Sequence, residues 1–148
     1  MMSLWQPEAR TRLRTRLGAL RPDAPPLWGK MNCPQVLAHV NDALRMATGE
    51  LPVAPRKLLL RFPPLKQLMV YVVPMPKGIP TARELVARID RAQFAEEAAA
   101  FPEMLEKFAS RPADARMPAH PAFGPLTRRA WGVLAYRHVD HHFRQFGV

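Results

Sequence analysis

Apolar residues recur at three- and four-residue intervals in four stretches of the 148-residue chain, the spacing expected for one face of an α-helix. The stretches are residues 7–21, 33–48, 81–110 and 126–146. Pro7 suits a first helical turn, Asn32 is a preferred N-cap, and Gly49 is a typical helix terminator. No stretch keeps the period of two that marks a half-buried strand, so the pattern predicts an all-α protein.

Prolines predict where these helices are interrupted. Residues 55–73 are apolar, but Pro63 and Pro64 divide them into two short pieces, which we expect to pack as a cover over one end of the helices. The four-residue sequence TARE, residues 81–84, is a capping box that predicts a helix start. Within the helix that follows, Pro102 predicts a kink or break near Phe101.

Composition indicates a single domain over residues 1–148, with 48% hydrophobic and 23% charged residues as in globular proteins. The N-terminus lacks the apolar core of a signal peptide, and charges interrupt residues 58–73, so we expect a cytoplasmic protein without a membrane span. Cys33 is the only cysteine, and in a first helical turn it is either a packing residue or a reactive thiol. No serine- or cysteine-centred triad, phosphate loop or dinucleotide motif is present.

The formal net charge of +10 could attract nucleic acid, anionic lipid or an acidic substrate. The surplus is concentrated in residues 1–30, 55–80 and 126–148; the middle range holds five basic and no acidic residues. Aromatic residues do not interleave with the basic ones in an RNA-binding pattern. The simpler interpretation is a solvated basic surface, so we expect neither a specific nucleic acid nor a membrane as partner.

Three of the five histidines lie within five residues, in the sequence HVDHH. His138 and His142 are one helical turn apart and continue an apolar stripe, while His39 lies inside the apolar stripe of residues 33–48. Three inward imidazoles from two helices could bind one divalent ion and leave a coordination position open for water or substrate. Two alternatives stay open: each ring could be satisfied by a carbonyl or carboxylate, or the three could form a metal-free polar network in the core.

Three further side chains are candidates for supporting such a site. His141 could contact a ligand or lie at the surface, with Asp140 or a neighbouring helix as partner. Gln145, three residues after His142, could bond a ligand imidazole or cap the helix end. His120 lies in the proline-rich loop of residues 111–125 and could approach the mouth of the site or simply pack that loop.

Two sequence motifs carry a resemblance to a known family. WGKMNCPQVLAHV lies near the start, and HPAFGPLTRRAWGVLAYRHVDHHFRQFG lies near the end. Together they resemble the DinB-like superfamily, in particular a branch of unassigned function with an HPxFG…HxxHHxRQF signature. The match is strong over residues 28–48 and 118–147 and weak between them.

The resemblance implies a four-helix bundle with long crossover connections, and a divalent metal held by His39, His138 and His142. Zinc or nickel is most expected, although iron and manganese also accept imidazole. Relatives in the superfamily include bacillithiol transferases and the mycothiol-dependent maleylpyruvate isomerase, and many form homodimers. We therefore expect a metal-dependent transferase or isomerase that uses a low-molecular-weight thiol and a small-molecule substrate. The alternative is a non-catalytic stress-response or binding protein with a basic surface.

Overall fold

The protein is built from helices, as its apolar periodicity predicts. The structure is a computed structural model, and it describes residues 1–77 and 89–148. The long helices are α1 (Pro7–Leu17), α2 (Cys33–Thr48), α5 (Phe94–Ala109) and α6 (Arg128–Arg144). Shorter ones are η1 (Leu59–Arg61), α3 (Leu65–Gln67) and the π-helical η2 (Leu68–Val72). The described residues form no strand, only an isolated bridge between His120 and Gly124.

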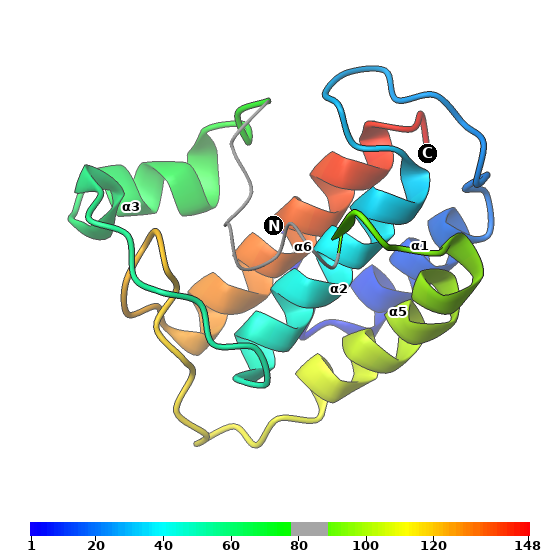
Figure 1. Cartoon of the computed structure of the whole chain (residues 1–148). Coiled ribbons are helices and arrows are strands. Elements are labelled where there is room, and N and C mark those ends of the chain that lie inside the picture. Colours follow the sequence, from blue (N-terminus) through cyan, green and yellow to red (C-terminus); the bar gives the residue numbers. More distant parts are fainter. Residues whose placement is uncertain (78–88) are drawn as a thin grey trace.

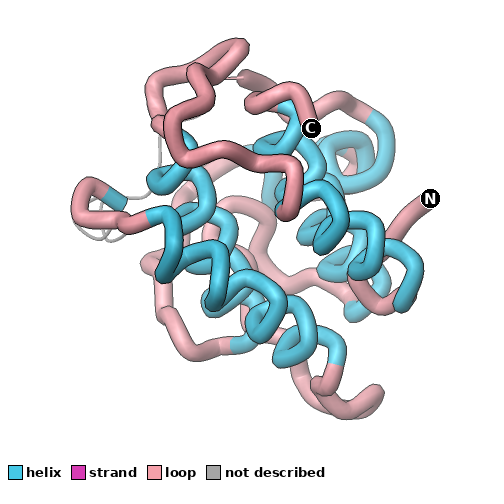
Figure 2. The backbone as a smooth tube through the Cα atoms, turned by 90° about the vertical axis from the view of Figure 1, so that its right-hand side faces the viewer, coloured by secondary structure: helices cyan, strands magenta, loops and turns pink. Residues whose placement is uncertain are grey.

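The four long helices pack side by side around one apolar core (Figures 1 and 2). α2 contacts both α5 and α6, and α1 contacts the same two helices. The predicted face of α5 is inside: Phe101, Leu105 and Phe108 are buried, and Phe94 packs against the same cluster. Among the described residues, no helix is long and apolar enough to cross a membrane.

Local signals fix the ends of α2 where the sequence predicts them. The Asn32 side chain accepts a hydrogen bond from the Gln35 backbone N–H, and the Gln35 side chain accepts one from the Asn32 N–H, both at 2.9 Å. At the other end, Gly49 takes a left-handed φ of 87° and its N–H points back to the last turn. Helix α6 begins after Thr127, whose hydroxyl oxygen accepts from the Ala130 N–H at 3.1 Å.

Three sequence expectations about helix extent are wrong. The stretch expected as one helix over residues 81–110 is interrupted at residues 90–93, and α5 begins at Phe94. α5 then runs without interruption through Pro102, so a break near Phe101 is absent, while the kink that was its alternative stays a prediction. Proline removes the N–H that would have reached the Ala98 carbonyl, and burial of Phe101 and Leu105 on either side offsets that loss. α1 stops at Leu17 rather than near residue 21, because the chain tightens into a turn after Gly18. The capping box expected at residues 81–84 lies outside the described residues.

The apolar stretch of residues 55–73 forms two short helical pieces separated at Pro63–Pro64, which confirms its predicted division. It lies against α6, at the left edge of the molecule in Figure 1. The Arg137 guanidinium of α6 donates to the backbone carbonyls of Met69, at 3.0 Å, and of Val70 and Val73. We call residues 55–73 the cover segment; these bonds fasten its end to the helix that carries His138.

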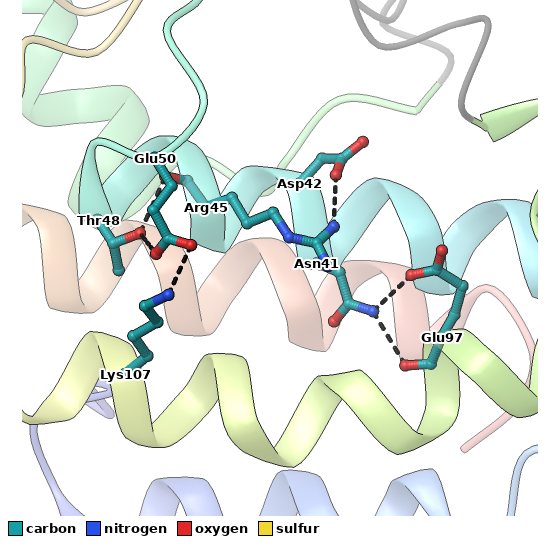
Figure 3. Close-up of polar contacts among 7 residues, drawn as sticks. All are labelled: Asn41, Asp42, Arg45, Thr48, Glu50, Glu97 and Lys107. Carbon is teal, nitrogen blue, oxygen red and sulfur yellow. Dashed lines mark hydrogen bonds and ion pairs between the residues drawn. The ribbon is translucent and has the colours of Figure 1, made fainter.

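A buried polar cluster joins α2 to α5 (Figure 3). The Asn41 side-chain amide donates to the Glu97 backbone carbonyl at 2.9 Å and to its carboxylate at 2.7 Å. Near the ends of the same two helices, Lys107 and Glu50 form an ion pair at 2.7 Å. Because buried hydrogen bonds are directional, this cluster sets the register of α2 against α5 and so helps to place His39.

The N-terminal residues cross α6 at Gly132, where only a glycine leaves room. The Leu4 N–H donates to the Gly132 carbonyl at 3.0 Å, and the Trp5 indole N–H donates to the Arg128 carbonyl at 2.8 Å. A Cβ on Gly132 would lie 2.3 Å from both the Ser3 hydroxyl oxygen and a Trp5 ring carbon. The close approach lets Trp5 stack on Phe108, with ring centroids 4.3 Å apart.

Gly132→Ala is therefore expected to destabilise the protein, although alanine normally favours a helix by about 1 kcal/mol. Displacing the N-terminal segment should cost about 2–3 kcal/mol, the range of overpacking, and lower the Tm by several degrees. The matched control is Gly18→Ala, where the nearest atom to the new Cβ is 3.4 Å away. Thermal unfolding followed by circular dichroism measures both variants, and an unchanged Tm for Gly132→Ala contradicts the prediction.

Candidate metal centre

His39, His138 and His142 lie together in the structure. His39 comes from the middle of α2, and the other two come from successive turns of α6. One ring nitrogen of each histidine can be chosen so that all three lie within 4.8 Å of one another. The sequence expectation that these three residues share one site is therefore matched by their positions.

The three rings face one another edge to face. Ring centroids are 4.8–4.9 Å apart for all three pairs, and the His39 and His138 Nε2 atoms are 3.0 Å apart. Imidazole nitrogens bind zinc-like ions at about 2.0–2.1 Å, so two ligands of one ion lie roughly 3 Å from each other. The separation of the two Nε2 atoms is compatible with a shared cation.

Gln145 orients one of the rings. Its Oε1 lies 3.0 Å from His142 Nδ1, and its amide Nε2 donates to the Trp28 backbone carbonyl at 2.7 Å. Because the amide nitrogen is committed to Trp28, the oxygen faces His142 and accepts from an Nδ1–H. That tautomer leaves the lone pair on His142 Nε2, which is how a metal-binding histidine is usually prepared by its neighbour.

Gly29 leaves the space that this arrangement needs. Its φ is 80°, and a Cβ added there would lie 2.7 Å from Gln145 Nε2. Any larger residue would combine backbone strain with displacement of the amide. Sequence analysis did not single out Trp28 or Gly29 as supports of the site; the only available signal was their place in the WGKMNCPQVLAHV motif.

Burial keeps the three imidazoles neutral. Desolvation is the main cause in each case: it lowers the pKa of His39 to about 4 and of His142 to about 3, and it lowers the pKa of His138 well below its ordinary value. For His39 the nearby Asp42 carboxylate partly opposes this decrease in pKa. Neutral imidazole is the form that binds a metal, so the cluster is in its binding form at pH 7.

The hydrogen bonds of the rings are compatible with a metal-free pairing as well as with a shared cation. The His39 and His138 Nε2 atoms lie at hydrogen-bond distance, 3.0 Å, and His142 Nδ1 pairs with Gln145. Among the described residues, none of the three rings bonds to a backbone carbonyl or a carboxylate. His39 Nδ1 is buried without any hydrogen-bond partner, and such an atom costs free energy.

His141 lies beside the cluster rather than in it. Its ring packs edge-on against His142, with centroids 5.2 Å apart, and against Trp28 at 5.7 Å. Asp140, which the sequence offered as its partner, forms ion pairs with Arg16 at 2.6 Å and Arg144 at 2.9 Å, and its charge also raises the pKa of His141. His141 is half-buried, and desolvation, followed by the Lys77 charge, lowers its pKa.

Lys77 is a neighbour of the site that sequence analysis missed. Its ammonium lies 4.2 Å from the centre of the Trp28 ring, a cation–π contact. Trp28 in turn connects to Gln145 and His141. The sequence does not reveal Lys77 as a neighbour of the site, because only folding brings this connector residue next to the loop before α2.

His120 packs its loop, and it also lies near enough to the cluster to be one of the groups that lower the pKa of His138. Its Nδ1 accepts from the backbone N–H groups of Ala122, at 3.1 Å, and Phe123, at 3.3 Å. Its ring packs on Phe123 and Trp131, with centroids 4.9 and 5.2 Å away. His120 therefore closes a tight turn over the start of α6.

The acid sensitivity of folding should fall when His120 is replaced by asparagine, whose side-chain oxygen can accept the same two bonds. Burial lowers the pKa of folded His120 from 6.5 to about 4. Between these values the unfolded state binds a proton that the folded state does not, so acidification favours unfolding. The stability tied to this residue is present above pH 6.5 and is lost as the pH falls toward 4, by roughly 3 kcal/mol in full.

Urea denaturation at pH 7, 5.5 and 4.5 measures this dependence for the wild type and His120→Asn. The other histidines titrate in both proteins, so only the difference between the two curves reports His120. Parallel curves would mean that His120 does not contribute.

Cys33 is a packing residue. Its side chain is fully buried in the main core, and desolvation raises the pKa of the thiol to about 11. Thiolate, not thiol, is the reactive form, so burial and the raised pKa favour the packing interpretation of Cys33 over the reactive one.

The fold and the cluster together define an all-α protein with three histidines from two helices gathered at one candidate metal centre. The sequence model of a family described as "Protein of unknown function (DUF1569)" matches residues 8–147, and the chain belongs to that family. No curated protein and no solved structure matches the chain.

Proposed function

We propose that His39, His138 and His142 bind one divalent cation and that the protein is a metal-dependent enzyme. The observation that carries this proposal is the convergence of three neutral imidazoles, their candidate ligand nitrogens within 4.8 Å of one another. The orientation of His142 by Gln145 and Trp28 supports it, because a lone-pair nitrogen is thereby aimed at the shared centre. Zinc or nickel is the expected ion, since both accept three imidazoles.

Access to the site supports a catalytic rather than a purely structural ion. His142 is buried, but His39 and His138 are only half-buried, so the cluster reaches the surface. Three protein ligands leave at least one coordination position for a small molecule, whereas structural zinc sites usually have four. A bound divalent cation supplies Lewis acidity and lowers the pKa of a thiol or water that joins it.

The described residues offer no nucleophile at this place. Cys33 is buried in the core with a raised pKa, and among the described residues no carboxylate belongs to the histidine cluster. The proposal therefore takes the nucleophile from a bound small molecule. The resemblance to the DinB-like superfamily favours a low-molecular-weight thiol, and with it the DinB-like form of the four-helix bundle and a homodimer as further parts of this proposal.

In the proposed transfer, the thiol gives its proton to solvent and its sulfur forms a bond to an electrophilic carbon. The leaving group departs with the electron pair of the bond that breaks. In an isomerisation the thiolate sulfur would instead add to a carbon–carbon double bond, and the electron pair of that bond would move to the neighbouring carbon. After rotation about the resulting single bond, the pair would return and expel the thiolate. Lys77, held over Trp28 beside His141, would attract a carboxylate of a peptide-like thiol. Arg137 is not proposed for that role, because it binds the carbonyls of the cover segment.

Elemental analysis of protein purified without a histidine tag tests the metal, and a thiol panel with a chromogenic aryl halide tests the reaction. One zinc or nickel ion per chain and thiol consumption that stops on chelation are expected. No bound ion, together with no uptake of added zinc or nickel in calorimetry, would reject the site. One bound ion without turnover of any thiol would favour the alternative of a non-catalytic binding protein.

A further inference from the structure

The exposed apolar side chains of this protein are concentrated in the cover segment. Nine large apolar side chains are exposed among the described residues, and seven of them lie between residues 58 and 73. Leu59, Phe62 and Val72 protrude furthest, at 75%, 64% and 67% exposed. The seven side chains, which we call the apolar face, are Leu58, Leu59, Phe62, Leu65, Leu68, Val72 and Val73. Exposed apolar side chains gathered in one short segment are typical of an interaction site.

The charge around the apolar face has one sign. Residues 55–73 contain four basic side chains and no acidic one: Arg56, Lys57, Arg61 and Lys66. Within the described part of the chain, none of these four pairs with a carboxylate. Arg61 donates to the backbone carbonyls of Arg56 and Pro121, and Lys66 donates to that of Pro125. These acceptors are neutral, so the positive charge of both side chains is uncompensated.

The cover segment is packed and hydrogen-bonded against the rest of the protein. Val70 is buried in a small core with Phe123, Ala130 and Leu134, so the inner side of the segment is firmly packed. Arg137 holds its last turn through three backbone carbonyls. These contacts hold the backbone that carries the exposed side chains in place beside α6 (Figure 1).

We propose that the apolar face docks on an anionic lipid surface. Aliphatic and phenyl side chains that protrude from short helices can enter the boundary between headgroups and acyl chains, while surrounding lysines and arginines meet the phosphates. A second copy of the chain suits this face poorly, because it would bring four more uncompensated positive charges to the contact. Sequence reasoning gave the segment the role of a cover and expected no membrane partner; the outward position of its apolar side chains changes that expectation.

The proposed mode is peripheral. No described helix is long and apolar enough to span a bilayer. The protein would therefore lie on the membrane through η1, α3 and η2, and it would remain sensitive to salt because part of its affinity is electrostatic. The proposal rests on exposure and charge alone and is independent of any metal.

Co-sedimentation with phospholipid vesicles tests the proposal. The wild type is expected to bind vesicles containing phosphatidylglycerol, to bind pure phosphatidylcholine at least tenfold less, and to be released by 0.5 M salt. The double variant Leu59→Ser/Phe62→Ser should lose at least tenfold in partitioning. The matched control is Leu27→Ser, since Leu27 is 69% exposed but lies outside the apolar face. All these positions are exposed, so folding should be retained, and circular dichroism checks it.

Two variants that each lack one lysine measure the electrostatic contribution to vesicle binding. Lys57→Gln removes an exposed cation next to the apolar face and should weaken binding to anionic vesicles about fivefold, as expected for one lysine near a charged surface. Lys30→Gln removes an exposed lysine elsewhere and should have a smaller effect.

Three results would overturn the proposal. The first is no binding to anionic vesicles even at low salt. The second is equal loss in Leu59→Ser/Phe62→Ser and Leu27→Ser. The third is a wild-type dimer, seen by light scattering, that dissociates only in the double variant, which would assign the apolar face to contact between copies.

Discussion

Replacing His138 by alanine is expected to reduce bound metal from one ion per chain to below about 0.1. His138 Nε2 lies 3.0 Å from His39 Nε2, and the His138 ring is as close to His142 as to His39, so its loss leaves only two imidazoles at the site. A divalent cation held by two neutral ligands exchanges readily with solvent, because affinity depends on ligand number and geometry. Elemental analysis of untagged protein after dialysis measures the loss.

The same variant should lose the stabilisation that the ion gives to the folded state. A ligand present at a hundred times its Kd adds about 2.7 kcal/mol, which corresponds to roughly 8 °C in Tm for a chain of this size. Wild-type Tm should therefore rise when zinc or nickel is added, whereas the Tm of His138→Ala should not. Comparing each protein with and without metal removes the effect of the substitution on packing.

His141→Ala is the matched control for this experiment. It removes an imidazole from the same helix only three residues away, but that ring packs beside Trp28 outside the three-histidine group. Its metal content is expected to remain near one per chain. Equal metal loss in both variants, or full metal content in His138→Ala, would show that the ligands are not the three proposed histidines.

The helices could be predicted from sequence where local chemistry decides their ends. Asn32 and Gly49 act on backbone groups within their own turn, so the limits of α2 coincide with the prediction. The limits of α1 and α5 depend on tertiary packing instead. Pro102 remains inside α5 because Phe101 and Leu105 are held in the core on either side of it, which a local rule about proline does not consider.

In the candidate site, too, local spacing predicts some residues, while others depend on tertiary contacts. His138 and His142 are brought together by helical spacing alone, and His39 was added because it interrupts an apolar stripe. The supports of the site, in contrast, act across long sequence separations. Trp28 contributes a backbone carbonyl, Gly29 contributes the absence of a side chain, and Lys77 contributes a charge from a connector. None of these contributions has a characteristic spacing, so a single sequence does not reveal them.

Gln145→Leu is expected to weaken metal binding 10- to 100-fold without removing a ligand. Leucine cannot accept from His142 Nδ1 or donate to the Trp28 carbonyl, so the tautomer and direction of the His142 ring are no longer fixed. Loss of such a supporting bond typically costs this factor in affinity. Competition with a chromogenic chelator measures it, and the stoichiometry should remain one ion per chain at saturating metal.

Gly29→Ala should act in the same direction, because its Cβ would lie 2.7 Å from the Gln145 amide nitrogen. The substitution also strains a backbone with φ of 80°, and Gly49→Ala separates the two effects. Gly49 has a φ of 87° with nothing within 4 Å of an added Cβ, so this control carries the strain alone. It should lower stability and leave metal affinity unchanged. If Gly49→Ala weakened metal binding as much as Gly29→Ala, general destabilisation rather than displacement of Gln145 would explain both. The two hydrogen bonds that link Trp28 to Gln145 and Gln145 to His142 would then have no specific role in metal binding.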